Sequence, residues 1–352
     1  SFDFNFENLG VNAGDKFSYY FEVWDNDAIN GPKSTRSKTM ILQTPTTKEK
    51  NIDDKEAREK TLDSFSNIEK EAEALKNELK NIKADLLSKK EMNWNDKDRV
   101  GDFLKQQESL QKNIEELQKD IAKKTQLSKQ SKEILEKQKL LEKMMAELMS
   151  DEMKKLYEEM NKLMNEMNKD ALLDKIDDVE MSQDNLLKEL DRSLEHFKRL
   201  ELENKAEKIA EKTQNLSNKQ RGLEEKTKDK NESLFNLTKE QNAIQSEFYE
   251  IQNELSELEE MNSELGSPKD LNKEDVEKEI NDALNESESE LENGKRKKSS
   301  ESQQNAADKM DDLASSLNEM SSSSNQEEED ADSMRQLLEN LLAFSIEQEV
   351  LL

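Results

Sequence analysis

The sequence predicts a mainly α-helical protein, in which long, segmented, antiparallel coiled-coil helices follow a short β-hairpin at the edge of a β-sandwich. Three observations support this fold class. Charged residues make up 39% of the 352 positions and apolar residues 32%, with only seven glycines and three prolines. A compact domain of this length needs more apolar side chains to offset chain entropy, so the composition is typical of long helices. The other two observations are periodicities: an early alternation and a later three-four repeat.

The alternation lies near the beginning of the chain. From residue 17 to 24 aromatic and β-branched side chains recur at every second position, which indicates a strand. Turn-forming residues then precede a second apolar run at 37–42, and together they predict a β-hairpin. An isolated hairpin is marginally stable in water, so we expect residues 1–45 to be the C-terminal strands of a truncated immunoglobulin-like β-sandwich. The side chains expected to pack that sandwich are Tyr19, Phe21, Val23 and Trp24.

Beyond residue 45 the apolar side chains return every three or four residues, the spacing of one face of an α-helix. This spacing is sustained between flanking charges at 110–121, 153–167 and 234–258, which favours coiled-coil packing. With the turn signals, the pattern predicts a long helix at 46–92, a coiled-coil helix at 96–149, methionine-rich helices at 150–182, a long coiled-coil helix at 183–265, a short helix at 266–293, and a linker with amphipathic terminal helices at 294–352.

Local signals place the helix ends. Asn95 or Asp96 is expected to cap the helix after the first break, and Gly266, which comes just before a proline, marks a later stop. Serine-, glutamate- and asparagine-rich segments at 286–302 and 321–332 lack an apolar face, and we interpret them as flexible or weakly helical linkers. The breaks favour antiparallel packing within one chain. A parallel homodimer would bury the same faces and stays open as an alternative.

Composition argues against several classes of function. A net charge of −28 repels phosphate backbones, so nucleic-acid binding is not expected. The chain has no cysteine and one histidine, His196, so ordinary zinc sites are excluded. This histidine is expected at the edge of a helix seam or at an exposed position, rather than as a general base or a metal ligand. The scattered glycines offer no phosphate-binding loop, and no apolar run reaches the roughly 20 residues that span a bilayer. We therefore expect no enzyme activity and no cofactor.

Two charged segments leave weaker alternatives. Asp25 and Asp27 partly follow the pattern of a calcium loop, but Ile29 occupies the next ligand position, which favours Asx turns at a hairpin tip. A glycan- or calcium-binding β module is the corresponding alternative. The basic run 295–298 lies among acidic residues, so we interpret it as part of a solvated linker rather than a contact for anionic lipid headgroups.

Two apolar surfaces are candidate partner-binding sites. The first is a methionine-rich helix face, whose flexible thioethers suit either an intrachain core or an adaptable groove for another protein's helix. The second is the strongly apolar face of the last predicted helix. The candidate residues are Met149, Met153, Met160, Met164, Met167, Leu337, Leu341 and Phe344.

Several segments together resemble a family of very large, uncharacterised envelope proteins of Bacteroidota, known as a domain of unknown function. They are YYFEVWDNDAINGPKSTRSKT at 19–39, NWNDKD at 93–98, ELMSDEMKKL at 147–156, LDRSLEHFKRLELENKAEKIAEKT at 190–213 and LLENLLAFSIEQE at 337–349. The resemblance implies a β-rich region followed by a long coiled coil, in a periplasmic protein anchored to the membrane by segments outside this chain. It brings no catalytic residues.

The function that follows is a non-enzymatic coiled-coil scaffold or spacer of the cell envelope. Its expected partners are other envelope proteins, or a second copy of the chain, bound through helical faces. The alternative is the coiled-coil arm of a mechanochemical ATPase whose nucleotide site lies outside these residues.

Overall fold

The computed structural model describes residues 14–25, 31, 33–125, 131–149, 151–268 and 273–322. It has two units, Ser1–Ala72 and Glu73–Leu352, with the division inside the first helix. The fold is mainly α, as the sequence predicts. Within the described residues, four short strands precede eight helices: β1 (Lys16–Tyr19), β2 (Glu22–Trp24), β3 (Ser34–Arg36), β4 (Met40–Gln43), α1 (Thr47–Leu87), α2 (Trp94–Thr125), α3 (Lys132–Glu147), α4 (Asp151–Asn165), α5 (Lys169–Lys228), α6 (Leu234–Ser263), α7 (Lys273–Glu292) and α8 (Arg296–Ser322).

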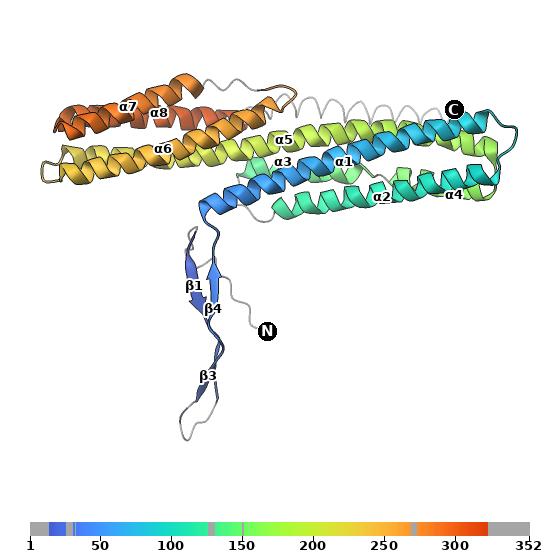
Figure 1. Cartoon of the computed structure of the whole chain (residues 1–352), viewed down its shortest axis with the longest axis horizontal. Helices are drawn as coiled ribbons and strands as arrows, with labels where there is room; N and C mark the ends of the chain where they lie inside the picture. Colours follow the sequence, from blue (N-terminus) through green and yellow to red (C-terminus); the bar gives the residue numbers. More distant parts are fainter. Residues whose placement is uncertain are drawn as a thin grey trace, which may run out of the picture. The chain divides into compact units, whose positions relative to one another are not determined.

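The strands form one long antiparallel ribbon (Figure 1). β1 pairs with β4, and β2 pairs with β3 closer to the tip. Between the two pairs, Phe21 and Ser37 bond each other: the Ser37 amide donates to the Phe21 carbonyl at 2.9 Å, and the Ser37 hydroxyl accepts from the Phe21 amide at 2.9 Å. The hairpin prediction is confirmed.

The aromatic side chains of this ribbon do not pack a sandwich within the described residues. Phe21 is 50% exposed, Val23 65% and Trp24 58%, so these side chains are not packed within the described residues, and the sandwich stays a prediction. Tyr19 is half-buried and contacts the Phe21 ring edge-on at 6.1 Å. The strands are two two-stranded sheets rather than two packed layers.

Capping boxes start the first two helices. Thr46 and Glu49 bond reciprocally at the start of α1: the Thr46 amide donates to the Glu49 carboxylate at 2.8 Å, and the Glu49 amide donates to the Thr46 hydroxyl at 3.2 Å. At the start of α2, Asn93 is the cap rather than Asn95 or Asp96. The Asp96 amide donates to the Asn93 side chain at 3.1 Å, and the Asn93 amide donates to the Asp96 carboxylate at 3.0 Å. Asp96 is thus the third residue of the helix and the acidic member of the box.

Helix α5 is the helix that the two bundles of the second unit share (Figure 1). Its 60 residues extend about 90 Å at 1.5 Å per residue. Its first part packs against α3 and α4, which also contact α2; we call these four segments the N-terminal bundle, with residues 169–203 of α5. Its second part packs against α6 and α8, which are joined by contacts with α7; these form the C-terminal bundle, with residues 204–228 of α5.

A ladder of ion pairs sets the antiparallel register of α5 and α6. Three lysines of α5, seven residues apart, face three glutamates of α6 with the same spacing. Seven residues are two helical turns, so the pairs lie along one edge of the helix interface. The ammonium–carboxylate distances are 2.6 Å for Lys212–Glu254, 2.6 Å for Lys219–Glu247 and 2.7 Å for Lys226–Glu240.

Several predicted segments differ from the structure. The predicted helix at 96–149 is divided into α2 and α3, and the predicted boundary between 182 and 183 lies inside the continuous helix α5. The predicted helix at 183–265 is interrupted at 229–233, where α5 ends and α6 begins. The predicted linker at 286–302 is helical except for residues 293–295, because Gly294 closes a tight α7–α8 turn. Gly294 has a φ of +69°, and its amide donates to the Leu291 carbonyl at 2.9 Å while the Lys295 amide donates to the Glu290 carbonyl at 2.8 Å. This is a Schellman turn, which favours glycine at its left-handed position.

Serine-rich α8 packs through a small-residue face. Ser299, Gln303, Ala306 and Ala307 are fully buried against neighbouring helices, although residues 296–307 lack the large apolar side chains that α8 has farther along. The Ser217 hydroxyl of α5 donates to the Ala307 carbonyl of α8 at 3.0 Å, which is possible because small side chains let the two backbones approach. The small, polar residues that suggested a linker therefore allow α8 to pack closely against α5.

The basic run at 295–298 also has a structural role. The Arg296 guanidinium donates to the carbonyls of Thr227 at 3.3 Å, of Asp229 at 3.0 Å and of Glu232. These carbonyls belong to the end of α5 and the turn into α6, where helical partners are missing. Arg296 thus joins the start of α8 to the α5–α6 turn.

Candidate functional site

A buried polar layer crosses the C-terminal bundle, with side chains from all four helices. Gln220 of α5 and Gln241 of α6 face each other, and the Gln220 amide donates to the Gln241 oxygen at 3.1 Å. The same oxygen accepts from Ser287 of α7 at 2.9 Å and from Gln303 of α8 at 3.1 Å. All four side chains are fully buried. The layer therefore joins four helices through one carboxamide, while only the Gln303 oxygen lacks a partner among the described residues.

The N-terminal bundle contains a second pair of buried carboxamides, from Gln107 of α2 and Gln183 of α5. Gln183 donates to the Gln107 oxygen at 3.2 Å, and the two residues are 2% and 1% exposed. The Gln107 nitrogen and the Gln183 oxygen have no hydrogen-bond partner in the part of the chain that the structure describes. This pair therefore keeps one donor and one acceptor unused.

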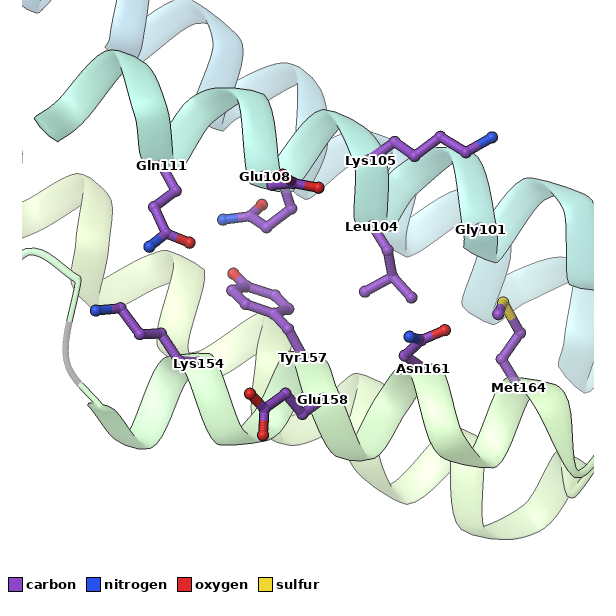
Figure 2. Close-up of a pocket in the computed structure, with 11 residues that line it drawn as sticks. Gly101, Leu104, Lys105, Glu108, Gln111, Lys154, Tyr157, Glu158, Asn161 and Met164 are labelled. Atoms are coloured by element: carbon purple, nitrogen blue, oxygen red, sulfur yellow. The ribbon is translucent and has the colours of Figure 1, made fainter. Parts of the chain in front are cut away.

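A groove between α2 and α4 opens beside this pair, with a volume of about 660 Å³. Figure 2 shows Gln111 opposite Lys154 and Gly101 opposite Met164, so the two helices run antiparallel. The lining residues recur at three-four spacing along each helix. From α2 they are Gly101, Leu104, Lys105, Gln107, Glu108 and Gln111, and from α4 they are Lys154, Tyr157, Glu158, Asn161 and Met164.

Tyr157 forms part of the groove wall. Its ring points from α4 toward α2 in Figure 2, and its hydroxyl is buried without a well-formed hydrogen bond in the described chain. Burial raises the pKa of the Tyr157 phenol above its ordinary value, and the nearby Gln183 amide opposes this by a smaller amount. The hydroxyl therefore stays protonated at neutral pH and can donate or accept a hydrogen bond.

The rim of the groove is charged but balanced. Lys105 and Lys154 lie beside Glu108 and Glu158, and three of these four charges pair along their own helices. Lys105 contacts Asp102 at 3.0 Å, and Glu108 contacts Lys112 at 2.8 Å. The hydrogen bond from Lys112 lowers the pKa of Glu108, so this carboxylate stays ionised at neutral pH. The rim thus carries no excess charge that would select a strongly charged ligand.

Most of the candidate methionines lie inside the fold. Met149, Met153 and Met160 are 7%, 5% and 0% exposed, so their burial favours core packing over an exposed surface. Met164 is also nearly buried, but it lines the groove, and its sulfur would lie 3.7 Å from a Cβ added at Gly101. The apolar candidates Leu337, Leu341 and Phe344 lie outside the described residues.

Met167 has a different role. Its φ is +57°, the left-handed conformation that a side chain disfavours. Its amide donates to the Met164 carbonyl at 3.2 Å, and the Asn168 amide donates to the Leu163 carbonyl at 3.1 Å. Met167 therefore takes the glycine position of a Schellman turn between α4 and α5.

His196 lies between helices. Its Nε2 is 3.1 Å from the Lys137 carbonyl of α3. Lys137 also pairs with the fully buried Glu203 of α5 at 2.6 Å, so this part of α5 is tied to α3. Among the described residues, no group of three or more histidine, aspartate or glutamate side chains could hold a metal ion. Nor does any described helix have an apolar stretch long enough to cross a membrane.

The site residues predicted from the sequence do not include Gln107, Gln183 or Tyr157. A signal was present, because Gln107 continues the three-four series of Phe103, Leu110 and Ile114. A polar residue at an apolar position of such a repeat costs stability and often specifies a partner.

Comparisons with protein-family models, with curated proteins and with solved structures gave no match to this chain.

Proposed function

We propose that this chain is a non-enzymatic helical scaffold or spacer that holds partner proteins apart in the cell envelope. The observation that carries the proposal is the continuity of α5, a single helix of 60 residues that belongs to both bundles. A helix packed on both of its halves resists bending, so it keeps a fixed distance between surfaces near its two ends.

The packing supports a rigid spacer. The helices of the two bundles bury apolar residues of α5 from Leu172 to Leu223. The lysine–glutamate ladder holds α6 against α5. Gly222 is the only glycine in α5 and lies within its helical span. A long helix that is packed on both halves within a highly charged chain suits a spacer.

The envelope location and the membrane anchor, through residues outside this chain, are part of the proposal. They are supported by the likeness of the segments quoted above to large envelope proteins of Bacteroidota. The expected partners are other envelope proteins or a second copy of the chain, bound through helical faces.

Distance measurement tests the spacer. The chain has no cysteine, so spin labels can be attached to cysteines introduced at the exposed positions Asp174 and Glu225 of α5. At 1.5 Å per residue these positions lie about 76 Å apart along the helix. We expect a single narrow distance distribution near that value from electron double resonance. A broad or two-peaked distribution would show a hinge in α5 and would contradict the spacer.

In-cell photo-crosslinking tests the partners. A photoreactive residue placed at Met181 of α5 or Tyr249 of α6, which are 69% and 65% exposed, samples the surface of each bundle. We expect crosslinks to other envelope proteins or to a second copy. ATP-dependent crosslinks, together with a nucleotide-binding loop elsewhere in a longer protein, would favour the ATPase arm instead. Intrachain products alone at both positions would contradict the scaffold.

A further inference from the structure

The two buried carboxamide pairs differ in one respect. In the C-terminal bundle, α8 brings Gln303 to the Gln220–Gln241 pair, and the third carboxamide donates to the shared oxygen at 3.1 Å. In the N-terminal bundle, the Gln107–Gln183 pair borders an open groove, and no third carboxamide of the described residues hydrogen-bonds to the unused atoms of the pair. We call the first arrangement the completed layer, because a third carboxamide is bound and only the Gln303 oxygen lacks a partner among the described residues.

We propose that the α2–α4 groove binds a helix of a partner protein, which inserts an asparagine or glutamine side chain beside Tyr157 and Gln107. This inference rests on the proposed scaffold function and names the chemistry of one partner. It assigns the groove to protein binding rather than to a small molecule.

The chemistry of the groove wall selects a carboxamide. On the groove wall, the Gln107 nitrogen is an unused donor and the Tyr157 hydroxyl can donate or accept. The Gln183 oxygen, an unused acceptor, lies behind the wall as the other member of the carboxamide pair. A carboxamide carries an acceptor and a donor on one carbon, so it can satisfy both kinds of group. A carboxylate lacks the donor, and an ammonium lacks the acceptor. Burying either charge here would also be costly, because three of the four rim charges already pair along their own helices.

The shape of the groove suits a helix. The α2 lining runs from Gly101 to Gln111, about 15 Å or nearly three helical turns. Two antiparallel helices with three-four lining positions form the surface into which a third helix packs its side chains. At one end, Leu104 and Met164 offer apolar contacts, and Met164 is flexible enough to adapt to the partner. The polar contact lies toward the other end, which fixes the register of the bound helix.

Photo-crosslinking at the groove tests the inference in the cells that make the full-length protein. The photoreactive residue replaces Asn161, an exposed groove residue, and Tyr249 on α6 is the matched position away from the groove. We expect the Asn161 probe to capture one protein, through a peptide whose helical segment contains asparagine or glutamine. Adding Gln107→Leu should reduce that product at least tenfold, while the Tyr249 products stay unchanged.

A synthetic peptide of the captured segment completes the test by fluorescence anisotropy with the purified chain. Replacing its asparagine or glutamine with leucine should weaken binding roughly tenfold or more, since the buried groups lose their partner. Equal binding of the leucine peptide would overturn the inference, as would capture of only this chain's own peptides at Asn161. If Asn161 captures nothing while Tyr249 captures partners, the groove inference fails and the scaffold stands. If neither captures a partner, the scaffold proposal fails as well.

Discussion

The two bundles that share α5 differ in how fully their buried polar side chains are hydrogen-bonded. In the C-terminal bundle, Gln220, Gln241, Ser287 and Gln303 bond one another across four helices. In the N-terminal bundle, Gln107 and Gln183 make one hydrogen bond and leave a donor and an acceptor unused within the described chain. A completed polar layer stabilises a specific arrangement of helices, whereas an incomplete one costs stability. This difference is the basis of our proposal that the groove of the N-terminal bundle binds a partner.

The largest effect is expected from removing the centre of the completed layer. Gln241→Leu leaves the Gln220 nitrogen, the Ser287 hydroxyl and the Gln303 nitrogen without their shared acceptor. Each buried group without a partner costs about 1–3 kcal/mol. Because the neighbouring side chains can partly rearrange, we expect the free energy of unfolding to fall by about 3 kcal/mol in total. Urea unfolding measures it. Loss of under 1 kcal/mol would show that the layer contributes little.

The α5–α6 turn should depend on one arginine. Arg296→Ala removes the hydrogen bonds to the carbonyls of Thr227, Asp229 and Glu232, with an expected loss of about 2 kcal/mol because the donor is charged. The matched control is Lys297→Ala, since the Lys297 side chain is 91% exposed. Hydrogen exchange at 226–237 should accelerate in the first variant only. Equal exchange in both variants would contradict the role of Arg296.

The capping box of α2 should give the N-terminal bundle a dependence on pH. Although burial alone would raise the pKa of Asp96, hydrogen bonds from Lys89 and the Asn93 amide hold it below its usual value. A carboxyl with a lowered pKa stabilises the fold above its unfolded pKa of about 3.9, and this contribution is lost as pH falls through the folded pKa. We expect Asp96→Asn to cost about 1 kcal/mol at pH 7 and almost nothing near pH 2. A cost independent of pH would contradict the ionic role of Asp96.

The smallest effects come from two turns with the same geometry and different residues. Gly294 and Met167 both occupy the left-handed position of a Schellman turn, with φ of +69° and +57°. Gly294→Ala should therefore destabilise the C-terminal bundle by about 1 kcal/mol, and Met167→Gly should stabilise the N-terminal bundle by up to about 1 kcal/mol. Thermal unfolding measures both. Gly222→Ala, inside α5 with open space around the added methyl group, is a control that should stabilise slightly.

Periodicity predicted the helices well, because each apolar face is a local property of the sequence. The residues from Phe65 to Leu86 and from Leu110 to Ile121 that follow the three-four repeat are buried, as expected of core positions. The β-hairpin was equally readable from its alternation and its turn residues. The α5–α6 turn was missed because 229–233 contains neither glycine nor proline. The helical start of α8 was missed because small serine and alanine side chains pack by backbone approach, which hydrophobicity does not reveal.

The groove could not be predicted from the sequence. Gln107, Gln183, Gln220 and Gln241 all occupy apolar positions of a three-four repeat, so the sequence marks them as unusual. Whether such a carboxamide finds its partners depends on helices far away in the chain. Gln241 meets Gln303 because α8 folds back against α5 and α6, and only the three-dimensional structure shows that no described helix does the same for Gln107.

The most direct test of this difference is one measurement on two matched double variants. Gln220→Leu with Gln241→Leu changes the completed layer, and Gln107→Leu with Gln183→Leu changes the incomplete one. In urea unfolding, we expect the free energy of unfolding of the first double variant to fall by about 2 kcal/mol, because Ser287 and Gln303 lose their acceptor. The free energy of unfolding of the second double variant should rise by about 1 kcal/mol. Its apolar side chains replace two carboxamides that contain unused polar atoms. A comparable loss in both variants would show that the N-terminal carboxamides are already satisfied, and would contradict an open site.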